Sequence, residues 1–70
     1  MRAWSAKQVI RVLMANGFVL SRQRGSHAIF RNENLKVSVP VPLHGKNKPI
    51  PIGTFLAIVK QSKLPRDLFQ

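Results

Sequence analysis

The fold is decided by a central stretch, residues 18–39, which has the sequence FVLSRQRGSHAIFRNENLKVSV. Short apolar runs alternate here with polar residues, and two strongly polar clusters interrupt them. This pattern is typical of strands joined by tight turns. We therefore predict three strands, over residues 18–23, 26–31 and 35–39, joined by a turn at 22–25 and a polar connection at 32–34.

Alternation within the second predicted strand separates two faces. Ala28 and Phe30 share one face, because successive side chains of a strand point in opposite directions. His27, Ile29 and Arg31 share the other face. We expect the first face to be covered by helices and the second to face solvent, as is common in antiparallel sheets.

A helix is predicted before the central stretch, over residues 5–16. Ser5 and Gln8 have the spacing of a capping box, in which the hydroxyl caps the helix and the glutamine reaches back. Trp4 and Val9 occupy the positions of a hydrophobic staple around that cap. Stacking of Trp4 on a nucleic-acid base is an alternative role, since aromatic rings bind single-stranded RNA in this way.

A second helix is predicted after the central stretch, from Thr54 as its N-cap to about residue 63. Apolar residues recur in it at helical spacing, and the pair Leu64-Pro65 ends it. Residues 40–53 contain four of the five prolines. Because proline disfavours both a helix and a central strand, we predict an exposed, semi-rigid loop there.

The predicted order of elements is helix, three strands, helix, in a single domain over residues 1–70. A three-stranded antiparallel sheet with two helices on one face is the simplest arrangement that buries the apolar side of each element. The sequence therefore predicts an α+β protein with a double-stranded-RNA-binding-like fold.

Charge is the strongest compositional signal. Twelve Lys and Arg residues against two acids give a net charge of +10, while 44% of the residues are hydrophobic. That hydrophobic content excludes a disordered basic tail. A domain with this charge attracts polyanions, so we expect nucleic acid as the first candidate partner and an anionic membrane or an acidic protein as the second. Without cysteine or a membrane-spanning apolar run, the chain is expected in the cytoplasm.

Carboxylates are too scarce for an obvious metal site. Glu33 falls in a predicted turn and Asp67 near the C-terminus, and these are the only two acids. Metal-assisted cleavage of phosphodiesters usually needs several carboxylates to hold Mg²⁺ or Mn²⁺. We therefore predict no metal and no other cofactor.

His27 is the first candidate catalytic residue. It follows a turn at the start of the second predicted strand, and histidine is the residue type that most often transfers protons in catalysis near neutral pH. Gly25 would let a phosphate approach the backbone, and Ser26 could donate a hydrogen bond to it. The alternative is a surface histidine without a catalytic role.

Six basic residues are candidate phosphate contacts: Arg22, Arg24, Arg31, Lys36, Lys46 and Lys48. Lys36 would join the face of His27 and Arg31 from the neighbouring strand if the register allows it. Contacts of this kind position RNA without selecting its sequence. The alternative is an ordinary solvated surface.

Four segments stand in a characteristic order: Leu13 with residues 16–18 (NGF), residues 22–30 (RQRGSHAIF), residues 39–40 followed by 44–45, and residues 53–61 (GTFLAIVKQ). Together they resemble the sequence pattern of the HicA (also called YcfA-like) toxin family. The resemblance covers about residues 5–64. Phe55, where the family usually has Leu, and the proline-rich residues 49–51 depart from the pattern without affecting His27.

The resemblance implies the toxin of a type II toxin–antitoxin pair. Members of this family are ribonucleases that cleave mRNA, called mRNA interferases, and their G-S-H histidine, which corresponds to His27, is catalytic. Gly25 and Ser26 correspond to the neighbours of that histidine in the motif. The partner implied is a HicB-like antitoxin that binds the toxin and masks its active site.

Three questions stay open at the level of sequence. His44 could supply a second acid or base if its loop folds toward His27, or it could simply sit in a turn. The chain could be an RNA-binding module that does not cleave, with the same fold and charge. It could also be an interaction protein that binds an acidic partner and no RNA.

Overall fold

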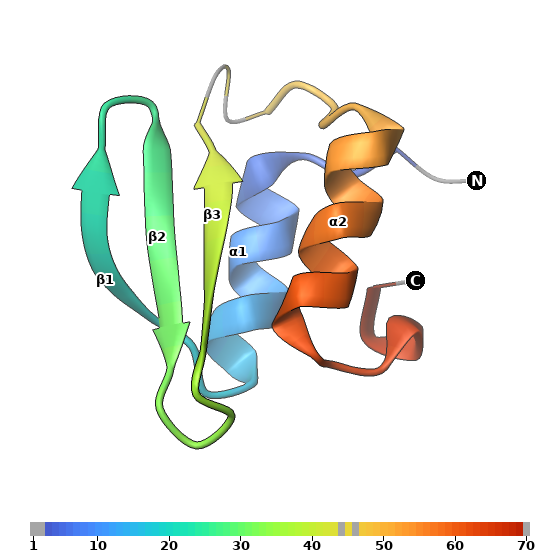
Figure 1. Cartoon of the computed structure of the whole chain (residues 1–70). Helices are drawn as coiled ribbons and strands as arrows, with labels where there is room; N and C mark the ends of the chain where they lie inside the picture. The colour runs from blue at the N-terminus through green and yellow to red at the C-terminus, as the bar shows by residue number, and fades with distance from the viewer. Residues whose placement is uncertain (1–2, 44, 46, 70) are drawn as a thin grey trace.

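The computed structural model describes residues 3–43, 45 and 47–69 (Figure 1). The elements follow the order α1 (Ala6–Ala15), β1 (Val19–Arg24), β2 (His27–Asn32), β3 (Val37–Pro42), α2 (Ile52–Ser62) and a short 3₁₀ helix, η1 (Arg66–Phe69). The predicted α-β-β-β-α order and the α+β, double-stranded-RNA-binding-like fold class are therefore confirmed.

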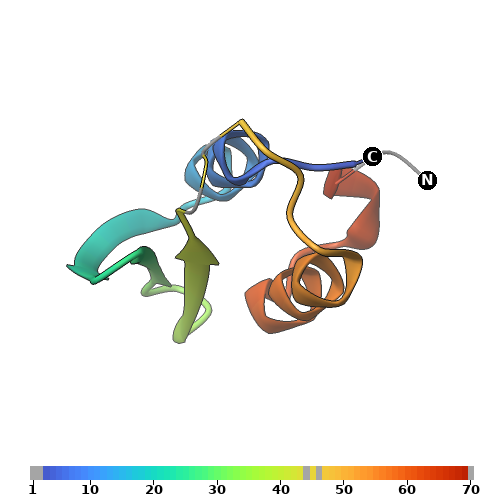
Figure 2. The same cartoon turned by 90° about the horizontal axis from the view of Figure 1, so that it is seen from above.

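The three strands form one antiparallel sheet in the order β1-β2-β3. Both helices pack against β3, and in the view from above β1 lies on the side of the sheet away from α2 (Figure 2). The core consequently fills the space between β3, α1 and α2. Val39 and Val41 of β3 are completely buried there, together with Val9 and Leu13 of α1.

The start of α1 forms as the sequence predicts. The Gln8 amide donates to Ser5 Oγ at 3.3 Å, and the Ser5 amide donates to Gln8 Oε1 at 3.0 Å, which completes the capping box. The helix ends at Asn16, and Gly17 follows with a φ of +91°, a conformation that favours glycine.

Trp4 belongs to an aromatic cluster beside the core. Its ring stacks on Phe55 with the centroids 5.6 Å apart and meets the edge of Phe69 at 5.9 Å. Phe55 and Phe69 are themselves in edge-to-face contact at 6.0 Å. The half-buried Trp4 ring thus has a structural role that joins the N-terminus to α2 and η1.

The prediction for β3 is wrong at both ends. Leu35 lies in the turn before the strand, and the strand continues through Pro40 and Pro42 into the segment predicted as loop. Proline is tolerated because β3 is an edge strand, where alternate nitrogen atoms point away from the neighbouring strand. Two prolines spaced two residues apart can therefore both face outward.

The loop prediction also fails close to α2. Ile50 is buried in the core, and its amide donates to the Trp4 carbonyl oxygen at 2.7 Å. The Phe55 amide donates to the carbonyl oxygen of Pro51 at 2.9 Å, so the first helical hydrogen bond begins at Pro51. Thr54 is therefore inside the first turn of α2 and is not its N-cap.

β1 is shifted by one residue from its predicted position and is exposed throughout. Phe18, predicted as its first residue, instead packs in the core and donates its amide to the Leu13 carbonyl oxygen at 3.0 Å. Val19 and Leu20 point to opposite sides of the strand, and both are exposed. Among the described residues, no helix therefore covers the outer part of the sheet.

Candidate active site

A two-residue hairpin turn places His27 at the end of the sheet. Gly25 has a φ of +59°, whereas Ser26 keeps a negative φ, which is the pattern of a type II′ turn with glycine at its first central position. The turn lies later than the predicted 22–25, because Arg22 and Arg24 are still part of β1. The Ser26 carbonyl oxygen accepts a hydrogen bond from the Leu43 amide at 2.7 Å, which ties the turn to the chain after β3.

The open face of the sheet is the face of β2 that carries His27, Ile29 and Arg31, opposite the buried Ala28 and Phe30. The strand register arranges the residues of this face in rows across β1, β2 and β3. Residues paired across neighbouring strands share a face. The first row is Arg24, His27 and Pro42, the second is Arg22, Ile29 and Pro40, and the third is Val19, Arg31 and Ser38. The predicted placement of His27 and Arg31 on one face is thus correct in register. Arg22 and Arg24, which the sequence places in a turn, join that face from β1.

A first hollow, the open-face hollow, lies where the first two rows meet. Its volume is about 570 Å³, and it is lined by Arg24, Gly25, His27, Ile29 and Pro40. It combines a guanidinium group and an imidazole with an apolar floor. The motif residues therefore lie around a space of the size that small ligands occupy, about 300–1,000 Å³.

A second hollow, the helix-side hollow, shares His27 with the first. Its volume is about 350 Å³, and it is lined by Ala6, His27, Pro42, Lys48, Pro49, Ile50, Pro51 and Thr54. Lys48 was a candidate phosphate contact, but nothing in the sequence placed Thr54 or the start of α1 here. The tertiary contact between residues 48–50 and the start of α1 creates this hollow.

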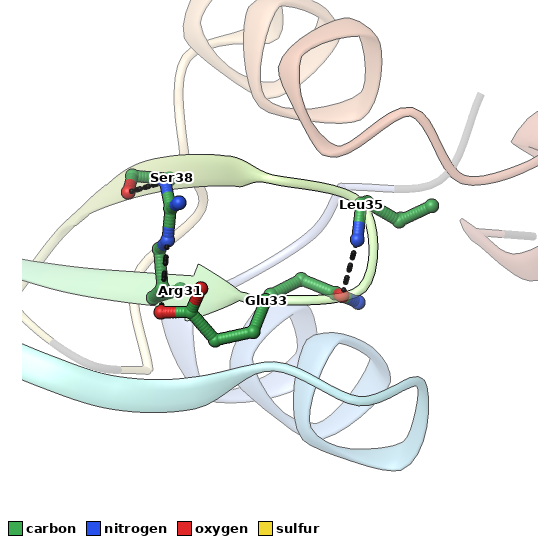
Figure 3. A network of polar contacts seen from close by, with 5 residues as sticks. Arg31, Glu33, Leu35 and Ser38 are labelled. Atoms are coloured by element: carbon green, nitrogen blue, oxygen red, sulfur yellow. Dashed lines mark hydrogen bonds and ion pairs between the residues drawn. The ribbon is translucent and has the colours of Figure 1, made fainter.

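Arg31 is held by two polar contacts on the open face (Figure 3). Its Nε lies 3.3 Å from Glu33 Oε2, and a guanidinium NH group donates to Ser38 Oγ at 3.2 Å. Glu33 partly compensates the charge of Arg31. Arg31 also stands four residues along β2 from His27, about 13 Å at the usual strand rise.

Lys36 does not join the face of His27, contrary to the prediction. It lies in the turn between β2 and β3 with a φ of +58°, at the end of the sheet opposite the Gly25 turn. The predicted third strand began too early, and the assumed alternation placed Lys36 in it. His44 and Lys46 lie outside the described residues.

Within residues 3–43, 45 and 47–69, no three His, Cys, Asp or Glu side chains gather in a group able to hold a metal ion. In the same part of the chain, no helix has the length and apolar character required to cross a lipid bilayer.

The comparison with protein families decides the identity. Residues 6–64 match the model of the HicA toxin of bacterial toxin–antitoxin systems. The chain belongs to the HicA toxin family. A comparison with curated proteins finds no match. The HicA match covers α1, the whole sheet, α2 and every residue that lines the two hollows, and it leaves out η1.

As a HicA-type domain, the chain is a toxin of the toxin–antitoxin kind, and membership of the family implies a cognate antitoxin as a partner. The family resemblance found in the sequence is therefore confirmed. In this HicA-type toxin, the G-S-H segment, residues 25–27, forms the turn and the first strand residue beside the two hollows.

Proposed function

We propose that this HicA-type toxin is a metal-independent endoribonuclease that cleaves mRNA in the cytoplasm, with His27 as the catalytic acid or base. The observation that carries the proposal is the position of His27, which lines both hollows at the end of a basic, open sheet face. An exposed imidazole at such a place can reach a bound polymer without any closure of the domain.

The proposed reaction uses the 2′-hydroxyl of RNA as its nucleophile. A base takes the proton of this hydroxyl, the 2′-oxygen forms a bond to phosphorus, and the bond from phosphorus to the 5′-oxygen breaks. The leaving 5′-oxygen takes a proton from an acid. The products are a 2′,3′-cyclic phosphate and a free 5′-hydroxyl, and His27 performs one of the two proton transfers.

Residues next to His27 have matching roles in the proposal. Arg24 pairs directly with His27 across the strands and shares the open-face hollow with it, so its guanidinium can hold a phosphate through two parallel hydrogen bonds. Gly25 lets the phosphate approach the turn, with Ser26 beside it. Arg22 continues this basic surface one row further, whereas Arg31 is engaged with Glu33 and contributes less.

Cleavage of a short single-stranded RNA in the presence of excess chelator tests this function. Wild type is expected to cut, and His27→Ala and His27→Gln are expected to lose cleavage by at least about a hundredfold, the lower range for general acid–base catalysis. Circular dichroism controls for folding, and an RNA with a 2′-deoxy sugar at the cleaved position must resist the wild type. Chelator-sensitive cleavage restored by Mg²⁺ would contradict a metal-independent mechanism.

The same variants separate cleavage from simple binding. An RNA-binding module that does not cut would bind RNA equally well with and without His27 and would leave every RNA intact. Either kind of RNA contact predicts an affinity that falls with salt, with a log–log slope of about −0.7 for each neutralised phosphate on a single strand. Expression in cells adds a physiological measure, since only the cleaving form should stop growth with loss of intact mRNA.

We propose that a HicB-like antitoxin restrains the toxin by covering His27 and the basic rows of the sheet. The charge of +10 favours an acidic partner surface through electrostatic complementarity. Adding the purified antitoxin to the cleavage reaction should therefore stop it at equimolar concentration. Unchanged cleavage in a mixture that forms the complex would place the antitoxin elsewhere on the toxin.

A further inference from the structure

We propose that one RNA strand passes over His27 from the open-face hollow into the helix-side hollow, where Lys48 and Thr54 bind the phosphate group next to the scissile one. This proposal rests on the proposed function and assigns a second subsite to the same site. It makes Lys48 and Thr54 substrate-binding residues of the toxin, although the G-S-H motif contains neither of them.

His27 is the junction of the two hollows, because it lines both. A substrate whose reacting phosphate lies at His27 has neighbouring nucleotides on either side. Arg24 lines the open-face hollow and Lys48 lines the helix-side hollow, so the RNA backbone would find a cation on each side of His27. Two cations that flank a single imidazole match the regular charges of a polynucleotide backbone better than those of a small ligand.

The polar groups of the helix-side hollow are available. Neither the Lys48 ammonium group nor the Thr54 hydroxyl group makes a hydrogen bond or ion pair with another residue in the described part of the chain. Both side chains are exposed in a hollow whose other lining residues, apart from His27, are apolar. An ammonium group and a hydroxyl group both donate hydrogen bonds to phosphate oxygens.

The segment that carries Lys48 is fixed before any ligand binds. The Lys48 amide donates to the Gly45 carbonyl oxygen at 2.8 Å, and the Ile50 amide donates to the Trp4 carbonyl oxygen at 2.7 Å. Pro49 forms a bridge with Ser5, the N-cap of α1. This anchoring lowers the entropy that the protein loses when Lys48 binds a phosphate.

The geometry selects a single strand over a duplex. The open-face hollow lies over Ile29 and Pro40 on the sheet, whereas the helix-side hollow lies beside Ala6 and Thr54, at the starts of α1 and α2. A polymer that fills both must pass from the sheet face to the starts of the helices at His27. A single strand can do so, but an A-form duplex keeps its backbone in a regular helix and its bases paired.

Binding to an uncleavable RNA tests the path separately from catalysis. The probe is a short single-stranded RNA with 2′-O-methyl groups, which lacks the attacking hydroxyl. Titration of ¹⁵N-labelled wild type should shift the amide signals of Arg24 and Ile29 in one hollow and of Lys48 and Thr54 in the other. The duplex formed from the same RNA should not shift the Lys48 and Thr54 signals.

Variants make the test quantitative. Lys48→Ala is expected to weaken binding about tenfold, as for loss of a hydrogen bond to a charged group, and to reduce the salt slope by about 0.7. Thr54→Val, which keeps the shape of the side chain, should weaken binding about threefold. Lys60→Ala is the matched control. Lys60 is an exposed cation of α2, the helix that carries Thr54, and it lies about 12 Å along the helix axis from Ile52, the first residue of α2.

The outcomes distinguish this path from the proposed function. If wild type cleaves RNA but Lys48→Ala and Thr54→Val bind like Lys60→Ala, the path through the helix-side hollow is wrong and the ribonuclease function stands. If both hollows shift and both variants weaken binding while no RNA is ever cut, the path stands and the ribonuclease function is wrong. Equal binding of duplex and single strand through both hollows also overturns the path.

Discussion

The two edge strands of the sheet differ in almost every respect. β3 packs against both helices, buries Val39 and Val41 completely and carries two prolines along its outer edge. β1 is exposed along its whole length, with 60% of Val19 and 55% of Leu20 open to solvent. One edge therefore holds the domain together, while the other presents Arg22 and Arg24 beside the candidate site.

The backbone hydrogen-bonding groups along the outer edges of β3 and β1 also differ. Pro40 and Pro42 remove two hydrogen-bond donors from β3, which hinders pairing with another strand. Apart from its bonds to β2, β1 makes no backbone hydrogen bond to any other described segment, and a bulge between Leu20 and Arg22 interrupts its register. The contrast teaches that a domain of this size can confine its core to one half of its sheet and leave the other half for contacts.

The sharpest test is one substitution made at both edges. Val39→Ala should lower the free energy of unfolding by about 2–3 kcal/mol, because it removes two buried methyl groups and leaves a cavity. Val19→Ala should cost less than about 0.5 kcal/mol, since the side chain is mostly in water. Urea denaturation measures both. Equal losses would mean that β1 is covered in solution.

A second pair compares amide side chains. Buried Asn32 donates from Nδ2 to the Asn16 carbonyl oxygen at 3.1 Å and accepts from the Leu35 amide at 2.9 Å. Asn32→Ala should therefore lower the free energy of unfolding by about 2 kcal/mol. Gln23→Ala on β1, which loses one exposed bond to Gly25, should change it by less than about 0.5 kcal/mol. A similar Tm for both variants would contradict this.

Substitutions in the turns at the two ends of β2 should change the stability less than those above, and with opposite signs. Gly25→Ala should destabilise by about 1 kcal/mol, because alanine is strained at a φ of +59°, although no atom beyond the two neighbouring residues lies within 4 Å of the added methyl group. Lys36→Gly should stabilise by up to about 1 kcal/mol, since the native lysine already adopts a φ of +58°. Thermal melts show whether the two shifts have opposite signs.

The smallest expected change in stability comes at Leu20. Leu20→Lys should leave the free energy of unfolding within about 0.5 kcal/mol of wild type. The added lysine should nevertheless reduce self-association at high concentration, because charge on an open edge opposes strand pairing. Sedimentation velocity measures the association. A Tm that drops by several degrees would show that Leu20 packs more closely than its exposure indicates.

Local signals in the sequence predict some features of the fold very well. The capping box fixes the start of α1, and the alternation around Ala28 and Phe30 correctly separates the covered face of β2 from the open one. The third predicted strand ends at Val39, because proline disfavours a central strand, whereas β3 runs to Pro42. The spacing of Pro40 and Pro42 would have indicated an edge strand, but which strand lies at an edge depends on the tertiary arrangement.

The candidate site also has one part that depends on local sequence and another that depends on the tertiary arrangement. Arg24, Gly25 and His27 are close in the sequence, so a tight turn is enough to bring them together. Lys48 and Thr54 line a hollow with His27 only because residues 48–50 bond to the start of α1 and α2 begins at Ile52. Long-range contacts of this kind leave no periodic pattern in the sequence. Lys48 is a predicted phosphate contact, but its placement beside His27 and the part of Thr54 in the hollow could not be predicted.

The surface charge makes salt act on this toxin in two opposite ways. Arg31–Glu33 is the one ion pair between side chains in the described part of the chain, against twelve basic residues in the sequence. The folded domain therefore repels itself, and added salt should raise its melting temperature while it weakens RNA binding. An acidic antitoxin, as proposed above, would neutralise part of this charge when it binds. At a free antitoxin concentration a hundred times its Kd, binding would add about 2.7 kcal/mol to the free energy of unfolding. Thermal melting can therefore also detect binding of the antitoxin.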